Sequence, residues 1–294
     1  MPRENRTWTI GEILDVTTGF FAERGMKHSP RLEAELLLAK VINLSRVNLY
    51  VNFERVLAED EITAYRALVA RRGKFEPVAY ILGEKEFHGI PFKVDSRVLV
   101  PRPETELIAD EVLRLARKTG DPKPSILDIG TGSGAIAVTL AKKLPESFVT
   151  ASDLSPDALA AARENAEANG LANIAFILAD LTDPPFPEDG EFDFVLANLP
   201  YVSSAEMAKL PPDVKNHEPA MALDGGPDGL DLYRRLVPKT KKLLKPGGRA
   251  LFELDPGQFP AMTELATENG LTPLEPLKDL ARFDRIFAAS REGD

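Results

Sequence analysis

A tetrapeptide at residues 198–201, Asn198-Leu199-Pro200-Tyr201, carries groups that could bind a planar amino group. The lone pair of a planar NH2 group is delocalised, so two acceptors aimed at its hydrogens would orient it and stabilise the charge that develops on methylation. Asn198 Oδ1 and the Leu199 carbonyl could be those acceptors; no general base is needed, because a protonated, methylated amide loses its proton to water. Pro200 confines Leu199 to extended geometry, and Tyr201 offers a flat, exposed face to the substrate. Asn and Pro also suit a plain turn, so the surrounding sequence has to decide.

A glycine-rich turn, DIGTGSGA at residues 128–135, could bind a nucleotide-containing ligand. Gly130, Gly132 and Gly134 lie between a strand-like and a helix-like segment, so the backbone can turn tightly and a ligand can approach without meeting a Cβ. Because Ala135 follows, the turn also fits the dinucleotide pattern G-x-G-x-x-G/A. A tight turn that only packs a helix would look similar. On this motif alone, a dehydrogenase and a methyltransferase both remain open.

Three aspartates near successive strand ends favour S-adenosylmethionine over a dinucleotide. Asp128 precedes the glycine turn, where it could help hold the cationic end of a ligand but would repel a pyrophosphate. Asp153 ends the next apolar run and could bind ribose hydroxyls. Asp180 ends the third run, where the adenine would follow.

The order of apolar runs predicts how these residues come together. Strand-like segments at 125–130, 148–153, 174–180, 192–198 and 249–254 alternate with helical segments, and residues 271–289 could supply two more strands. This alternation predicts an α/β fold with a doubly wound, mostly parallel, seven-stranded sheet. In the strand order 3-2-1-4-5, Asn198 emerges beside the Gly130 to Gly134 turn.

The rest of the chain predicts a second, smaller domain. Residues 1–83 read as a small helical bundle, with a capping box at Thr9 and Glu12. Residues 84–100 alternate apolar and polar positions around a His-Gly pair, as a hairpin linker would. The methyltransferase-like domain is expected over residues 101–294.

Composition limits the function classes. With 36 basic and 46 acidic side chains, the net charge of -10 argues against a surface built to hold nucleic acid. There is no cysteine, and His28, His88 and His217 lack metal-ligand spacing, so we expect no metal site. A polar start and the lack of any long apolar run predict a cytoplasmic protein without membrane segments, and we expect a monomer.

The motifs together resemble a known family. DIGTGSG, ASD, LAD and NLPY resemble class I S-adenosylmethionine-dependent methyltransferases that act on planar amino groups. PRPETE at 101–106 and NHEPAMALDGGPDGLDLYRRL at 216–236, together with the helical N-terminal region, are similar to the PrmC/HemK family. That family methylates the side-chain amide N5 of the glutamine in the GGQ motif of bacterial peptide chain release factors, and releases S-adenosyl-L-homocysteine. The resemblance covers nearly the whole chain and implies that the helical domain docks the release factor.

The resemblance also implies roles for individual residues. The family usually has proline where Leu199 stands here; leucine keeps the carbonyl acceptor but leaves the loop less rigid. The implied cofactor-binding residues are Gly130, Thr131, Gly132, Ser133, Gly134, Asp153 for the ribose, and Asp180 and Leu181 for the adenine. We also expect Asp128 and Asn198 to contact the cofactor. The implied catalytic and glutamine-binding residues are Asn198, Leu199, Pro200 and Tyr201. Arg102, Pro103 and Glu104 could form a cover over both ligands; alternatively, Glu104 and Glu106 only stabilise the start of a helix.

Three alternatives stay open at this point. The same chemistry could act on a ribosomal protein glutamine, or on adenine N6 of RNA or DNA, since NLPY also occurs in rRNA adenine dimethyltransferases. A dehydrogenase or a non-catalytic nucleotide-binding domain would bind NAD instead. Tight, steeply salt-dependent binding would indicate a nucleic-acid substrate, and stabilisation by NAD alone would indicate the last class.

Overall fold

The computed structural model describes residues 7–26, 29–120, 123–183, 186 and 190–293. Contacts divide the chain into two compact units. The first holds the described part of residues 1–83 together with α10 (Pro212–His217), and the second holds the described part of 84–211 and 218–294. The hairpin expected as a linker is therefore part of the second unit.

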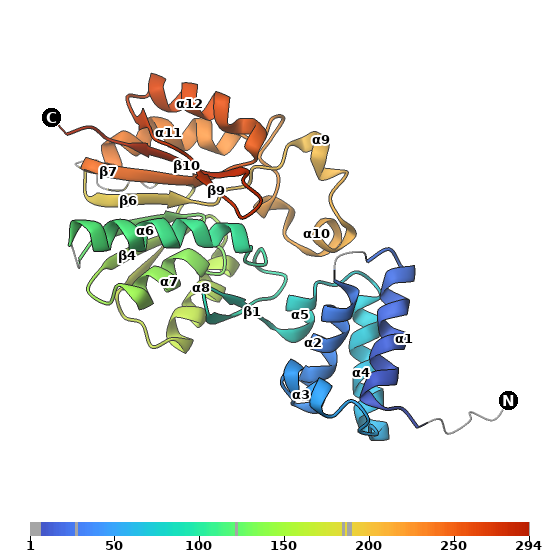
Figure 1. The fold of residues 1–294 in the computed structure, drawn as a ribbon. Helices are drawn as coiled ribbons and strands as arrows, with labels where there is room; N and C mark the ends of the chain where they lie inside the picture. The colour runs from blue at the N-terminus through green and yellow to red at the C-terminus, as the bar shows by residue number, and fades with distance from the viewer. Residues whose placement is uncertain (1–6, 27–28, 121–122, 184–185, 187–189, 294) are drawn as a thin grey trace. The chain divides into compact units, whose positions relative to one another are not determined.

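The first unit is a bundle of helices (Figure 1). It contains α1 (Ile10–Glu23), α2 (Pro30–Ile42), α3 (Arg46–Val51), α4 (Glu59–Arg72) and α5 (Val78–Leu82). The capping box begins α1: Glu12 N–H donates to Thr9 Oγ1 at 3.2 Å, and Thr9 N–H donates to Glu12 Oε2 at 2.9 Å. Both N–H groups would otherwise lack partners at the helix start. Buried apolar side chains, Phe21 and Leu37 among them, form the core.

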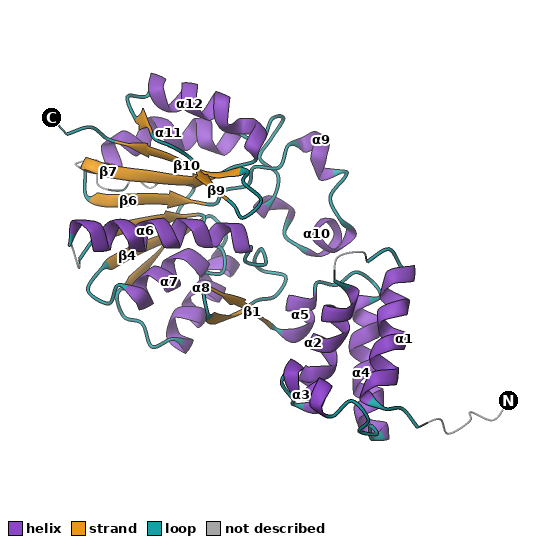
Figure 2. Ribbon diagram, viewed as in Figure 1, coloured by secondary structure: helices purple, strands orange, loops and turns teal. Residues whose placement is uncertain are grey.

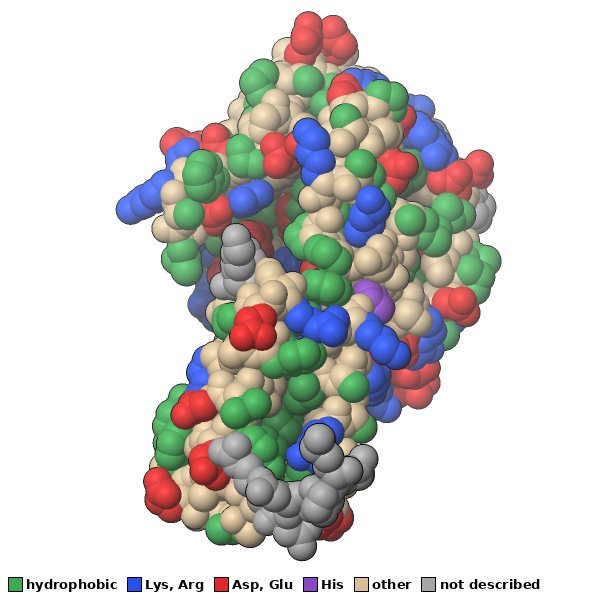
Figure 3. Space-filling model, turned by 90° about the vertical axis from the view of Figure 1, so that its right-hand side faces the viewer, with side chains coloured by type: hydrophobic (Ala, Val, Ile, Leu, Met, Phe, Trp, Pro, Cys, Tyr) green, Lys and Arg blue, Asp and Glu red, His purple; other side chains and the backbone are tan. Residues whose placement is uncertain are grey.

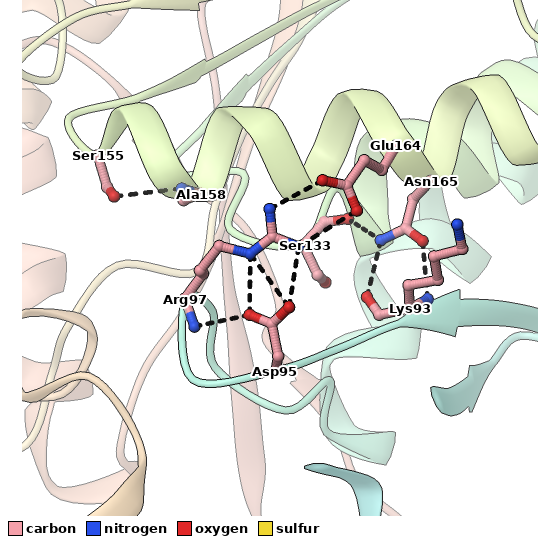
Figure 4. A network of polar contacts seen from close by, with 8 residues as sticks. All are labelled: Lys93, Asp95, Arg97, Ser133, Ser155, Ala158, Glu164 and Asn165. Atoms are coloured by element: carbon pink, nitrogen blue, oxygen red, sulfur yellow. Dashed lines mark hydrogen bonds and ion pairs between the residues drawn. The ribbon is translucent and has the colours of Figure 1, made fainter. Parts of the chain in front are cut away.

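The hairpin pairs β1 (Glu84–Phe87) with β2 (Ile90–Lys93) in antiparallel register. His88 and Gly89 have φ angles of 53° and 76°, which give the tight two-residue turn that matches the twist of the two strands. Lys93 N–H donates to Asn165 Oδ1 of α8 (Pro156–Ala168) at 2.7 Å, as Figure 4 shows. This contact attaches the hairpin to the second unit.

The second unit is built on one large sheet, shown in orange in Figure 2. Its strand order is β5-β4-β3-β6-β7-β10-β8, and β9 pairs with β10. β5, β4, β3, β6 and β7 are parallel, and β10 is antiparallel to β7. The predicted order 3-2-1-4-5 is confirmed, with a short eighth strand added. The strands are β3 (Ser125–Ile129), β4 (Phe148–Asp153), β5 (Ile174–Leu178), β6 (Phe192–Ala197), β7 (Leu244–Glu253), β8 (Thr272–Pro273), β9 (Leu277–Lys278) and β10 (Asp284–Ser290).

Helices cover both faces of the sheet, so the fold is doubly wound (Figure 2). One buried cluster joins α6 and α7 to the sheet, and another joins α11 and α12 to the opposite face. Among the described helices, none is long and apolar enough to cross a membrane. The helices of this unit are α6 (Glu106–Thr119), α7 (Ala135–Lys143), α8, α9 (Ser204–Met207), α11 (Asp231–Leu243) and α12 (Phe259–Glu268), with single turns η1 (Pro103–Thr105), η2 (Ala220–Ala222) and η3 (Pro256–Gln258).

Candidate active site

A cavity opens at the carboxyl ends of β3, β4, β5 and β6, where ligands bind in doubly wound sheets. All of its lining residues belong to the second unit. The predicted site residues that line it are Arg102, Gly130, Thr131, Gly132, Ser133, Asp153, Asp180, Leu181, Asn198, Leu199 and Pro200. Five others, all within the described part of the chain, do not line it: Pro103, Glu104, Asp128, Gly134 and Tyr201.

The glycine loop needs glycine for two separate reasons. Gly130 has a φ of +73°, and a Cβ there would come within 2.8 Å of Leu199 Cδ2. Gly132 has a φ of +56°, but a Cβ there would meet nothing within 4 Å. Gly130 therefore allows the Asn198-Leu199 segment to pack against the loop, while Gly132 provides the open space that a ligand could fill.

Asp128 contacts the glycine loop but does not line the cavity. Its side chain is fully buried, and its Oδ2 accepts a hydrogen bond from Thr131 Oγ1 at 2.7 Å. The carboxylate does not line the cavity, so the structure gives no direct support to the expectation that it holds the cationic end of a ligand. Its observed contact is with Thr131 of the glycine loop. Burial raises the pKa of the Asp128 carboxyl to about 7.

The raised pKa of Asp128 has a measurable consequence. The ordinary pKa of an aspartate is 3.8, so between pH 3.8 and about pH 7 the folded protein holds a proton on Asp128 that the unfolded chain has released. The contribution of this group to stability is thus full below pH 4 and lost as pH rises towards 7, by up to about 1.4 kcal/mol per pH unit. We expect the free energy of unfolding of the parent, relative to Asp128→Asn, to fall over this range in urea titrations. A difference that is constant with pH would contradict the assignment.

Asp153 ends β4 at the edge of the cavity, as predicted. Gly132 N–H donates to its Oδ2 at 2.9 Å, and Ser155 N–H donates to its Oδ1 at 2.9 Å. The carboxylate thus connects the glycine loop to the start of α8. Burial raises its pKa, and the backbone N–H donors partly oppose that shift because they favour the charged form.

The third strand end brings Asp180 and Leu181 to the cavity. Asp180 Oδ2 accepts from Arg235 Nη2 of α11 at 2.8 Å. Leu181 is buried, with a φ of +58°, a conformation that few residues other than glycine adopt. The backbone at this position presents a leucine side chain to the cavity wall.

The Asn198-Leu199 segment leaves β6 directly beside the glycine loop. Asn198 Nδ2 donates to Thr105 Oγ1 of η1 at 3.0 Å, which leaves Oδ1 free to accept from a ligand. Leu199 N–H donates to Tyr233 OH at 3.3 Å. A proline at this position has no N–H to donate, so this chain replaces the stiffness of a proline ring with a buried hydrogen bond.

Tyr201 is not the exposed aromatic that the sequence predicted. Its ring packs against the core, and its hydroxyl donates to Glu253 Oε1 at 3.0 Å. Its carbonyl accepts from Gln258 Nε2 at 2.8 Å. Tyr201 does not line the cavity, and its hydroxyl is one of two donors to the buried Glu253 carboxylate, so its observed contacts anchor the loop.

Hydrogen bonds join the chain around residues 101–106 to the segment 216–236, the two segments that resemble the PrmC/HemK family. Arg102 Nη2 donates to Glu218 Oε1 at 2.6 Å, and Val100 N–H donates to Glu218 Oε2 at 3.2 Å. Arg102 therefore forms part of the cavity wall, as predicted. Pro103 and Glu104 do not, because η1 directs the next inward side chain, Thr105, to the cavity.

Arg97 closes another part of the cavity wall, and the sequence reading missed it. As Figure 4 shows, its guanidinium bridges Asp95, which follows the hairpin, and Glu164, which lies on α8. Nη2 donates to Asp95 Oδ2 at 2.9 Å, and Nη1 donates to Glu164 Oε1 at 2.8 Å. Asn165 Nδ2 of the same helix donates to Ser133 O at 2.9 Å. One helix thus holds both the segment after the hairpin and the glycine loop.

The histidines do not gather. His88 Nε2 lies 3.0 Å from Asp110 Oδ1, His217 contacts the Lys74 carbonyl, and His28 lies outside the described residues. Within the described part of the chain, no group of three His, Cys, Asp or Glu side chains could hold a metal. The absence of a metal stays a prediction.

A glycine-loop cavity at the switch point of a β5-β4-β3-β6-β7 sheet, with an Asn-x-Pro-Tyr segment at the fourth strand end, defines a class I S-adenosylmethionine-dependent methyltransferase. The family model described as a methyltransferase domain matches residues 126–216. A methyltransferase from Pyrococcus furiosus of known structure has the same fold, with a TM-score of 0.52 and 18% identity over 70% of this chain and 90% of that one.

Two further comparisons define the family. The model described as the PrmC N-terminal domain matches residues 12–83. The release factor glutamine methyltransferase of Geobacter sulfurreducens is 43% identical over 97% of this chain and 98% of its own length. That of Rhodopirellula baltica is 42% identical over 97% of both chains. The chain belongs to the release factor glutamine methyltransferase family.

Proposed function

We propose that this protein transfers a methyl group from S-adenosylmethionine to the side-chain amide N5 of the glutamine in the GGQ motif of peptide chain release factors. The observation that carries the proposal is the Asn198 amide. Its Nδ2 is bonded to Thr105, so its Oδ1 is available as an acceptor at the wall of the glycine-loop cavity. An acceptor at this place suits an amide NH2, which can only donate.

The cavity residues fit S-adenosylmethionine. Gly132 leaves open space where the amino acid part of the cofactor can approach the backbone. The Asp153 carboxylate suits ribose hydroxyls, and the buried Leu181 offers the adenine an apolar contact. When bound, the cofactor supplies an electrophilic methyl group on its sulfonium.

The residues of this chain bind and orient the amide that receives the methyl group. Asn198 Oδ1 and the Leu199 carbonyl accept one hydrogen each from the glutamine NH2, which fixes the direction of its lone pair. Both acceptors also stabilise the positive charge that grows on this nitrogen in the transition state. Pro200 keeps Leu199 extended, so its carbonyl holds one direction. The proton leaves to water.

The helical first unit is proposed to dock the release factor. Support comes from apolar side chains exposed on α3, with Val47, Tyr50 and Val51 showing 72%, 52% and 75% of their surfaces. Isolated exposed apolar residues are ordinary, but three within six residues favour a contact surface.

We propose that the enzyme acts as a cytoplasmic monomer.

A nucleic-acid substrate has less support. Lys and Arg side chains lie among Asp and Glu side chains over the face drawn in Figure 3. In the first unit, Arg71 and Arg72 pair with Glu76 and Glu33. Such pairs reduce the net positive charge that a phosphate backbone would meet.

The test is to incubate the purified full-length protein with S-adenosylmethionine and an unmethylated release factor, and to locate any added methyl group by peptide mass spectrometry. We expect one methyl group on the GGQ glutamine. A release factor with asparagine in place of that glutamine is the matched control and should stay unmodified. Methylation of a ribosomal protein or of RNA adenine, with the release factor unmodified, would contradict the proposal.

A further inference from the structure

A chain of hydrogen bonds leads from Asn198 through Thr105 to Glu253, and the proposed function has used only its first bond. Asn198 Nδ2 donates to Thr105 Oγ1 at 3.0 Å, and Thr105 Oγ1 donates to Glu253 Oε2 at 2.6 Å. Tyr201 OH donates to Glu253 Oε1 at 3.0 Å. Thr105 and Glu253 are 4% and 2% exposed, so water does not compete strongly for these bonds.

The direction of this chain is determined at Glu253. Burial raises the pKa of the Glu253 carboxyl, whereas the Thr105 and Tyr201 hydroxyl donors and the charge of Arg285 oppose that shift because they favour the ionised form. Oε2 accepts from Thr105 and Oε1 accepts from Tyr201, and a donor at each oxygen is the pattern of an ionised carboxylate, which only accepts hydrogen bonds. Thr105 has one hydroxyl proton and directs it to Glu253. Towards Asn198 the hydroxyl then offers a lone pair alone, which the Asn198 NH2 group must meet.

The orientation of Asn198 matters because its amide is nearly symmetric in shape. A half-turn about its last bond exchanges an acceptor for a donor with little change in packing. With Oδ1 towards the substrate, Asn198 accepts from the glutamine NH2. In the reversed orientation two NH2 groups would face each other, and the substrate nitrogen would lose an acceptor.

Glu253 is an unusual residue for a buried strand end. Among the described residues no Lys or Arg lies within ion-pair distance of it; the charge of Arg285, which pairs with Asp279, acts on Glu253 only from farther away. A buried carboxylate without a cation is unfavourable, and an apolar side chain would pack in its place more stably. The buried carboxylate is therefore better explained by the two hydroxyl groups that it orients than by a gain in stability.

We propose that Thr105 and Glu253 are positioning residues, which act through Asn198 by holding its amide with Oδ1 towards the substrate nitrogen. The inference rests on the proposed function and assigns two residues to it. Glu253 directs the Thr105 proton, and Thr105 in turn directs the Asn198 amide. Tyr201 supplies the second donor that keeps the carboxylate in place.

Thr105→Val tests the inference, because valine keeps the shape and removes the hydroxyl. With a release factor as substrate, we expect kcat to fall by roughly tenfold to a hundredfold, and the Kd for S-adenosylmethionine to stay unchanged. Thr105→Ser keeps the hydroxyl and should restore kcat to near the parent value. Thr240→Val is the matched control: Thr240 is also fully buried, but its hydroxyl donates to Leu236 O within α11.

A second readout separates positioning from a merely structural role. Thr105→Val should weaken the binding of the release factor to the enzyme saturated with S-adenosylhomocysteine. In a protein that already carries Asn198→Ala, adding Thr105→Val should weaken this binding no further, because Thr105 acts through Asn198. An unchanged kcat in Thr105→Val, equal losses in the valine and serine variants, or an added loss in the Asn198→Ala background would each overturn the inference.

The parent enzyme and a Glu253 variant complete the design. If the parent does not methylate the release factor, the proposed function fails, whatever the variants do. If the parent does and the variants behave as it does, only the inference fails. Should Thr105→Val not fold, Glu253→Gln gives the same readout: its NH2 group can donate to a hydroxyl, so the direction of the chain is lost.

Discussion

In Asn198→Ala, we expect kcat for methylation of a release factor to fall by roughly 10²–10³-fold, while the Kd for S-adenosylmethionine changes little. The variant removes the only side-chain acceptor proposed for the substrate NH2 group. The backbone carbonyl of Leu199 stays, so the amide can still bind but is no longer held on both sides. Single-turnover kinetics would measure the loss at the chemical step, and calorimetry would measure cofactor affinity.

A matched control makes the Asn198 result specific. Asn269 is also an asparagine with a bonded amide, since its Nδ2 donates to Leu265 O at 2.8 Å, but it lies at the end of α12 and does not line the cavity. Asn269→Ala should leave kcat at the parent value. If Asn198→Ala also kept most of the parent kcat, the amide-binding role of this segment would be wrong.

The sequence was sufficient for the parts of the site that are contiguous in the chain. The glycine loop and the Asn198-Leu199 segment could be identified because each is a short string with a chemical reason for every residue. Their proximity followed from the alternation of strands and helices, which determines the order of parallel strands. The strand order of the structure confirms that inference.

Orientation was harder to predict than position. Asp128 and Tyr201 were placed beside the right loops, but neither side chain lines the cavity. In each case the deciding partner is buried: Thr131 and the surrounding core for Asp128, and the Glu253 carboxylate for Tyr201. A local pattern names the residue at a strand end but does not say which buried group its side chain contacts.

Thr105 and Glu253 could not be found by spacing at all. They are separated by 148 residues in the chain, and Thr105 by 93 residues from Asn198. The one available signal was Glu253 itself, a charge that ends the apolar run of β7. It resembles Asp153 at the end of β4, and Asp180 and Asn198 just after β5 and β6. A polar residue at each adjacent strand end reads as a site only once the strand order is known.

Asp153→Ala is expected to raise the Kd for S-adenosylmethionine by roughly tenfold to a hundredfold. The carboxylate accepts from Gly132 N–H and Ser155 N–H, and a carboxylate has about four acceptor sites, so capacity is left for ribose hydroxyls. A hydrogen bond to a charged group contributes about 1.5–3 kcal/mol, and about 1.4 kcal/mol corresponds to a factor of ten in affinity. Calorimetry on the full-length protein measures the change.

Asp153→Ala removes both the proposed contact to the ribose and the hydrogen bonds that anchor the glycine loop, and two further variants separate these effects. Asp157→Ala removes an exposed aspartate from the first turn of α8 and should leave cofactor affinity unchanged. Asp153→Asn keeps one acceptor oxygen but replaces the other with an NH2 group, which cannot accept from a backbone N–H. If the ribose contact dominates, asparagine should recover part of the lost affinity; if the anchoring of the glycine loop dominates, it should bind as weakly as alanine. Unchanged affinity in Asp153→Ala would refute both roles, since each requires the carboxylate at this strand end.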